Sequence, residues 1–107
     1  MTGEQFVQLC RAEADAMHQT YTDPDSETAV SEIMRKCEQS GADRANLESL
    51  VRAVIAESWY TVLCALDGAV SLDGEQQTYQ LHDEDGTLLN PCGELEDAAY
   101  RLFMEEE

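Results

Sequence analysis

The chain has 107 residues, and its 23 acidic side chains against six lysines and arginines give a formal net charge of −17 at pH 7. A charge of this sign repels nucleic acid and anionic membranes, so it leaves a basic protein as the favoured electrostatic partner. The hydrophobic content of 43% is enough to build a core, which predicts one folded domain over residues 1–107 and argues against a disordered chain.

Two amphipathic helices are predicted in the N-terminal part of the chain. The first is expected over residues 2–21, where apolar side chains recur every three or four positions, and Pro24 lies beyond its end. The second is expected over residues 27–40, with Ser26 as its N-terminal cap. Gly41 follows at the place where a left-handed residue commonly ends a helix.

The third predicted helix is the longest, and it runs from a cap at Asp43 to about Leu66. Its first half is expected to point Leu50 and Val54 toward the core, together with the neighbouring apolar residues of the same period. Residues 59–66 are apolar on nearly every side. This pattern predicts a central helix with other elements packed all around its second half.

The pattern changes after residue 66. Asp73-Gly74 and Asp85-Gly86 are turn signals, and residues 78–81 between them alternate in polarity, which predicts a short β-hairpin. A last amphipathic helix is expected over residues 95–103. The predicted fold class is therefore α+β and mostly helical, with a three-helix N-terminal bundle that contains the long central helix, followed by the hairpin and the C-terminal helix.

The cysteines and the N-terminus favour a reducing compartment. The four cysteines stand at positions 10, 37, 64 and 92, a spacing that is not typical of zinc sites, and they are expected to be buried reduced thiols. The N-terminus has no basic segment followed by an apolar run, and we expect no stretch long enough to span a bilayer. The predicted location is cytoplasmic.

No residue pattern predicts a metal, a cofactor or a catalytic site. The acidic run before Gly86 resembles a calcium loop, but with Gly86 at the sixth position the first and twelfth positions are Leu81 and Cys92. The two histidines lack the spacing of metal ligands, and the chain has no glycine-rich phosphate loop. Cys92 is the one cysteine placed just before a helix, where a thiolate is favoured, but the three acids that follow it closely disfavour the thiolate. We expect no enzymatic activity.

Most of the negative charge lies in the C-terminal half. Residues 1–53 carry 10 acids and five bases, whereas residues 54–107 carry 13 acids and one base. A dense acidic surface accelerates the encounter with a basic protein and orients it. We therefore expect carboxylates of the hairpin and the last helix to contact such a partner, and the candidates are Asp73, Glu75, Asp83, Glu84, Asp85, Glu94, Glu96 and Asp97.

The same half of the chain carries a pattern that is similar to one in a known kind of protein. Its residues are Leu66-Asp67-Gly68, then Tyr79-x-Leu81-x-Asp83-x-Asp85-Gly86-x-x-Leu89-Asn90, then Leu95 and Tyr100. Over residues 57–103 the chain resembles small acidic immunity-type proteins of bacterial polymorphic toxin systems. The resemblance implies a protein that works by occupying the surface of a toxin, and it implies no catalytic residues.

Three functions follow from charge, pattern and resemblance. The leading hypothesis is an immunity protein that neutralises a basic toxin or nuclease by occupying its active cleft. A phage-type DNA mimic that inhibits a DNA-binding defence protein is the first alternative, since an array of carboxylates can fill a phosphate-binding cleft. The second alternative is a helical adaptor or assembly protein with apolar contacts. High salt should leave the binding of such a protein unchanged.

Overall fold

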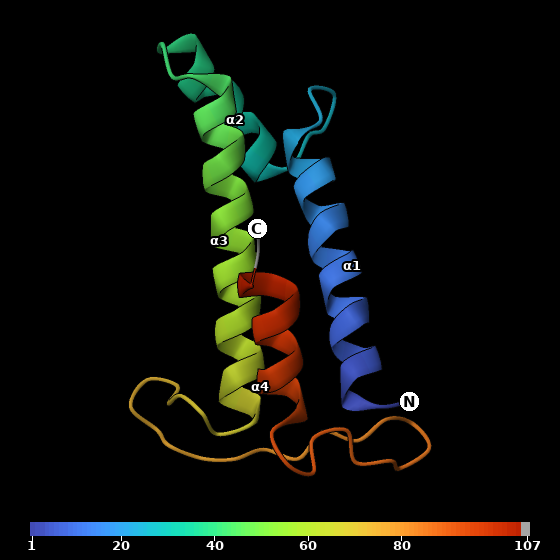
Figure 1. The fold of residues 1–107 in the computed structure, drawn as a ribbon. Helices are drawn as coiled ribbons and strands as arrows, with labels where there is room; N and C mark the ends of the chain where they lie inside the picture. Colours follow the sequence, from blue (N-terminus) through green and yellow to red (C-terminus); the bar gives the residue numbers. More distant parts are fainter. Residues whose placement is uncertain (106–107) are drawn as a thin grey trace.

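The computed structural model describes residues 1–105 and is built from helices packed side by side (Figure 1). Two long helices, α1 and α3, run along the molecule, and α4 packs between them at one end while α2 lies near their other end. The overall dimensions are 48 × 30 × 28 Å. The helices are α1 (Gly3–Thr22), α2 (Ala29–Gln39), α3 (Arg44–Leu66) and α4 (Glu94–Ala99), and the π-helical turn η1 (Tyr100–Met104) continues α4.

The first three helices begin at side chains that cap their free amide groups. Thr2 and Gln5 form the reciprocal capping box at the start of α1, with N···O distances of 3.1 and 2.8 Å. Asp43 caps α3 as predicted, accepting from a backbone amide at 3.1 Å. The cap of α2 is Thr28 rather than Ser26, so this helix begins two residues later than expected.

The core lies where α1, α3 and α4 meet. Val7 of α1, Leu63 of α3 and Leu95 of α4 are the largest fully buried apolar side chains there, and each is at most 1% exposed. Phe103 of η1 closes the core and stacks on Trp59 of α3, with ring centroids 6.4 Å apart. The predicted C-terminal helix is thus confirmed, and it docks between the two long helices.

The predicted β-hairpin is wrong, and so is the α+β class. Within residues 1–105, the segment between α3 and α4 contains no strand and forms just two isolated bridges, Leu72 with Glu75 and His82 with Leu88. Both Asp-Gly turns do form, and Gly74 and Gly86 adopt positive φ. The protein is all-α with one long irregular segment.

Competing hydrogen bonds explain why the alternating residues build no ladder. The amide of Leu89 donates to the carbonyl of Leu81 at 2.7 Å, which is the beginning of a strand pair. The amide of Tyr79, however, donates to the carbonyl of Leu66 at the end of α3, at 3.0 Å. The amide of Leu81 donates to the side chain of Asn90 at 2.9 Å. These donors are therefore not available to extend the pair.

The prediction that the second half of α3 is surrounded on all sides is also wrong. Residues 63–65 are buried, but Val62 is 51% exposed. Leu50 and Val54, which were expected to point inward, are 59% and 54% exposed. In the described part of the chain, the other helices pack against one side of α3 and leave the opposite side open (Figure 1).

The apolar character of α3 also corrects the expectation about membrane-spanning segments. By length and composition α3 is able to cross a membrane, because its most apolar 18-residue stretch has a mean hydropathy of 1.3. Core helices of soluble proteins meet the same criterion. In this case 22% of the stretch is buried, which is little for a core helix.

Candidate acidic binding surface

The predicted partner-binding residues lie at the end of the molecule where α3 stops and α4 starts. We call the segment from Asp67 to Asp97 the acidic base, because it is rich in carboxylates and forms the bottom of the molecule as drawn in Figure 1. No lysine or arginine stands between Arg52 and Arg101, so the acidic base has no basic side chain of its own. Its first loop contains the Asp73-Gly74 turn, and its second loop contains the Asp85-Gly86 turn. In Figure 1 the first loop, drawn in gold, extends to one side of α3, and the second loop, drawn in orange, passes below the start of α1.

Asn90 is the side chain that holds the acidic base to the helices, and it is 7% exposed. Its Nδ2 lies within hydrogen-bonding distance of three oxygens, which share its two hydrogens. These are the carbonyl of Tyr79 at 2.8 Å, Oδ1 of Asp67 at 2.9 Å and the carbonyl of Leu66 at 3.3 Å. Its Oδ1 accepts from the amide of Leu81. One buried amide group thus ties both loops to the end of α3.

Asp67 provides the N-terminal cap that α4 lacks. The N-cap residue of α4 is Gly93, which has no side chain to accept a hydrogen bond. Oδ2 of Asp67, at the end of α3, accepts from the amide of Glu96 at 2.8 Å instead. A carboxylate in this position satisfies a free amide and interacts favourably with the helix dipole. The start of α4 is therefore fixed to the end of α3.

Asp83, one of the predicted partner contacts, shapes the second loop instead of facing outward. Its Oδ1 accepts from the amides of Asp85 at 3.0 Å and Thr87 at 2.9 Å, and its side chain is 13% exposed. The amino group of Met1 lies 3.6 Å from Oδ2. The hydrogen bond from Thr87, followed by that from Asp85 and the nearby amino group, lowers the pKa of this carboxyl group.

Two further candidates have partners within the protein. Oε1 of Glu94 accepts from the amide of Cys92 at 2.7 Å. Asp97 pairs with Arg101 at 3.1 Å, and Arg101 also pairs with Glu4 at 2.8 Å. Both pairs raise the pKa of Arg101, the contact with Glu4 more strongly. The sole arginine of the C-terminal half is therefore already neutralised by two carboxylates.

The remaining candidates are free to meet a partner. Their side chains are exposed, and within residues 1–105 their carboxylates have no hydrogen bond or ion pair. They do not gather in one pocket, because the two loop tips lie on opposite sides of the acidic base (Figure 1). These free acids are Asp73, Glu75, Glu84, Asp85 and Glu96.

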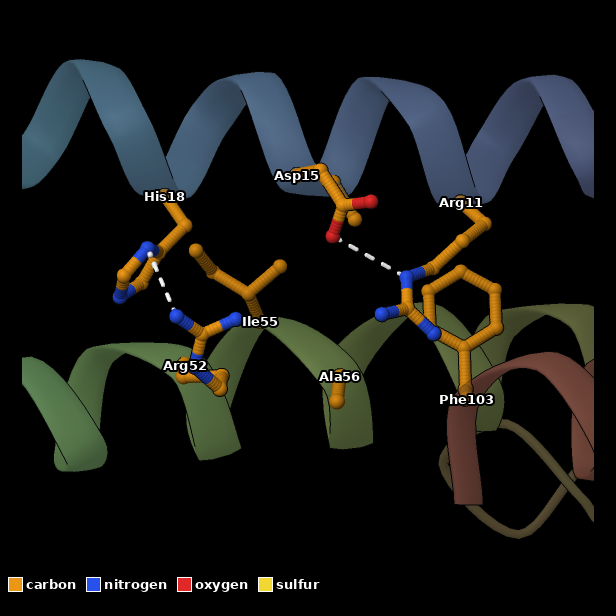
Figure 2. Close-up of a pocket in the computed structure, with 8 residues that line it drawn as sticks. Arg11, Asp15, His18, Arg52, Ile55, Ala56 and Phe103 are labelled. Atoms are coloured by element: carbon orange, nitrogen blue, oxygen red, sulfur yellow. Dashed lines mark hydrogen bonds and ion pairs between the residues drawn. The ribbon is translucent and has the colours of Figure 1, made fainter. Parts of the chain in front are cut away.

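A small cleft between α1 and α3 holds a second group of charged side chains, shown in Figure 2. Nε of Arg11 lies 3.0 Å from Asp15, and Arg52 lies 3.4 Å from Nδ1 of His18. Nε2 of His18 lies 3.3 Å from the carbonyl oxygen of Glu48. The cleft has a volume of about 30 Å³, about that of one water. The contacts of His18 with Glu48 and Arg52 connect α1 to α3, whereas Arg11 pairs with Asp15 inside α1 and also donates to the carbonyl of Leu102 in η1.

The four cysteines differ in burial. Cys10 and Cys64 are buried, as expected, and burial is the main factor that raises the pKa of both thiols. Cys37 is half-buried and Cys92 is exposed, so the expectation of buried thiols does not hold for Cys92. Within the described residues no three metal-binding side chains are grouped as ligands.

Comparison of the chain with protein-family models, with curated proteins and with solved structures finds no match. The relation to immunity-type proteins therefore stays a prediction that rests on the pattern in residues 57–103. Reasoning from sequence found the acidic residues but missed the roles of Asp67 and Asn90. Asn90 stands between the apolar pair Leu88-Leu89 and Pro91, and a polar residue in that setting is the signal that was available.

Proposed function

We propose that the protein is a non-catalytic inhibitor that binds a basic protein through its acidic base, in the manner of an immunity protein that occupies the active cleft of a toxin or nuclease. The single observation that carries the proposal is the set of five free acids on a segment with no lysine or arginine. Unpaired carboxylates on one segment attract a basic surface and increase the rate of association.

The way the acidic base is held supports the same function. Asn90 and Asp67 tie the loops to the ends of α3 and α4, so the carboxylates are carried on a segment that is already ordered. A preorganised surface loses less conformational entropy on binding than a flexible acidic tail. The two loop tips at opposite sides of the base would let the carboxylates reach both walls of a cleft.

The test compares two triple variants that change the net charge equally. The first replaces Glu75, Glu84 and Glu96 with lysine, all three of them free acids of the acidic base. The control replaces Glu13, Asp25 and Glu27 with lysine; these are exposed acids outside the base. Asp83 is left intact because it shapes its loop.

The three proteins are immobilised and used to capture partners from lysate of the source organism, with washes at low and then high salt. A basic protein retained at low salt by the wild type and the control, released at high salt and lost from the acidic-base variant, is the expected result. The captured protein is then assayed with and without the inhibitor in equimolar amount. Equal retention by the acidic-base variant would refute the proposal.

Competition with duplex DNA separates the proposed inhibitor from a DNA mimic. A mimic occupies a phosphate-binding cleft, so excess duplex should displace it from its partner. An inhibitor directed at any other cleft should stay bound. A helical adaptor is the second candidate function, and it is favoured by the exposed apolar side of α3.

A further inference from the structure

The open side of α3 is apolar and nearly uncharged. Its three largest apolar side chains, Leu50, Val54 and Val62, are 59%, 54% and 51% exposed. Glu57 is the one charged residue among them, in a chain of which 27% is charged. We call this surface the outer face of α3, and it consists of Leu50, Ala53, Val54, Glu57, Ser58, Thr61 and Val62.

The shape of this surface suits a second helix. A shallow groove runs along it from Val54 to Val62, and another flanks it between Ala53 and Met104. The small side chains of Ala53 and Ser58 let a helix backbone approach closely, and helices pack by fitting ridges into such grooves. Within residues 1–105, α1, α4 and η1 pack on the other side of α3 (Figure 1).

We propose that the outer face of α3 is covered by the same face of a second copy of this chain, with the two α3 helices antiparallel. Two chains of charge −17 repel each other at most orientations, and the outer face is a surface on which they can meet with little charge between them. Contiguous exposed apolar surface of this kind commonly marks an interaction site.

Repulsion between the acidic bases selects the antiparallel order. A parallel pair would place two acidic bases next to each other. An antiparallel pair separates them and sets each beside the α2 end of the other copy. Residues 22–53 there carry seven acids but also four of the six basic residues, Arg35, Lys36, Arg44 and Arg52, so the repulsion is weaker than between two acidic bases. Lys36 is exposed and has no ion pair within the described residues.

In the antiparallel order, apolar side chains of the outer face of one copy lie opposite apolar or small side chains of the other. If Val54 lies opposite Ser58 of the second copy, then Leu50 lies opposite its Val62. The stretch from Leu50 to Val62 is about 18 Å long, and a strip about 10 Å wide along it is only a few hundred Å² per copy. A standard interface buries about 800 Å² per partner, so the pair should be weak and dependent on concentration.

A lipid bilayer fits the outer face less well. The other side of α3 contributes Leu63 and Ile55 to the core, so insertion of the helix into a bilayer would require the domain to open. The net charge repels an anionic membrane surface. The pairing of two copies leaves the core intact and needs no such rearrangement.

Sedimentation equilibrium over about a hundredfold range of protein concentration tests the proposal, at low and at high salt. A monomer–dimer equilibrium is expected, and salt should strengthen the dimer because it screens the repulsion between the two chains. Binding through the acidic base should respond to salt in the opposite direction. The failure of one proposal is thus distinguishable from the failure of the other.

Three variants locate the contact. Val54→Asp should weaken the dimer roughly tenfold or more, because it buries an unpaired charge. Glu57→Gln should strengthen it, because it removes the one charge from the face. Leu9→Asp is the matched control: Leu9 is 57% exposed on α1, so this change should leave dimerisation unaltered. Circular dichroism checks that each variant is folded.

Several results would overturn the proposal. A monomer at every concentration and salt would do so, as would a dimer that Val54→Asp does not weaken. Flotation of a monomeric wild type with neutral phosphatidylcholine vesicles, abolished in Val54→Asp, would assign the face to lipid instead.

Discussion

The helices and the acidic base are stabilised by different kinds of contact. α1, α3 and α4 are held together by apolar side chains such as Val7, Leu63 and Leu95, which recur at the period of a helix. Polar side chains hold the acidic base: Asn90 and Asp67 form hydrogen bonds with groups 9 to 29 residues away along the chain. A periodic apolar pattern can be recognised in a sequence, whereas the polar residues that form such long-range hydrogen bonds recur at no fixed spacing.

The two regions also differ in charge. Five of the six basic residues precede residue 54, and two of them pair there with acids: Arg11 with Asp15 at 3.0 Å, and Arg44 with Glu38 and Glu48 at 3.2 and 3.0 Å. The acidic base has no such residue and leaves five acids unpaired. Negative charge without any basic side chain in the same segment is thus a property of the acidic base.

The largest effect is expected from a cavity in the helical core. Leu63→Ala should lower the free energy of unfolding by about 2–5 kcal/mol, the usual cost of removing a buried leucine side chain. α3 contacts both α1 and α4 at this point, so helical circular dichroism and Trp59 fluorescence should report one urea transition. Two separate transitions would show that the helices do not unfold as one unit. Val62→Ala, on the exposed side of the same helix, is the control.

A smaller and local effect is expected at Asn90. Asn90→Ala removes the hydrogen-bond partners of two carbonyls and one amide. The free energy of unfolding should therefore fall by roughly 1–3 kcal/mol. Amide hydrogen exchange should accelerate in residues 67–93 and change little in α1. Asn90→Asp keeps the acceptor but places a second carboxylate beside Asp67, so it should be no less damaging. Equal acceleration in α1 would contradict the separation of the two regions.

The smallest effect is expected from the pH dependence of Asp83. Its pKa is lowered in the folded protein, mainly by the amide of Thr87. A lowered pKa stabilises the fold at any pH above the unfolded value, and this contribution is lost as the pH falls below about 4 through the folded value. The thermal midpoint of Asp83→Asn should therefore fall less than that of the wild type between neutral and acidic pH. An identical fall in both proteins would show that Asp83 does not contribute.

Local signals predicted most of the helical structure correctly. Thr2 with Gln5 and Asp43 mark the starts of α1 and α3, since a cap bonds to amides only two or three residues ahead. The side of α3 that faces the core was predicted less well. Leu50 and Val54 are as apolar as the buried Leu63, so hydrophobicity alone does not show that they are exposed. Periodicity shows that a helix has an apolar stripe, but it does not show how many neighbours the domain has to cover it.

The amino-acid sequence by itself determined the net charge, the acidic C-terminal half and the positions of four helices, since these depend on composition and on contacts within one helical turn. Tertiary structure alone decided that residues 67–93 form no sheet, that Asp83 faces inward and that one side of α3 stays open. The reason is that each backbone donor forms its bond with the best acceptor within reach in the folded chain. For Tyr79 and Leu81 those acceptors are Leu66 and Asn90, which only the folded arrangement of the helices brings near.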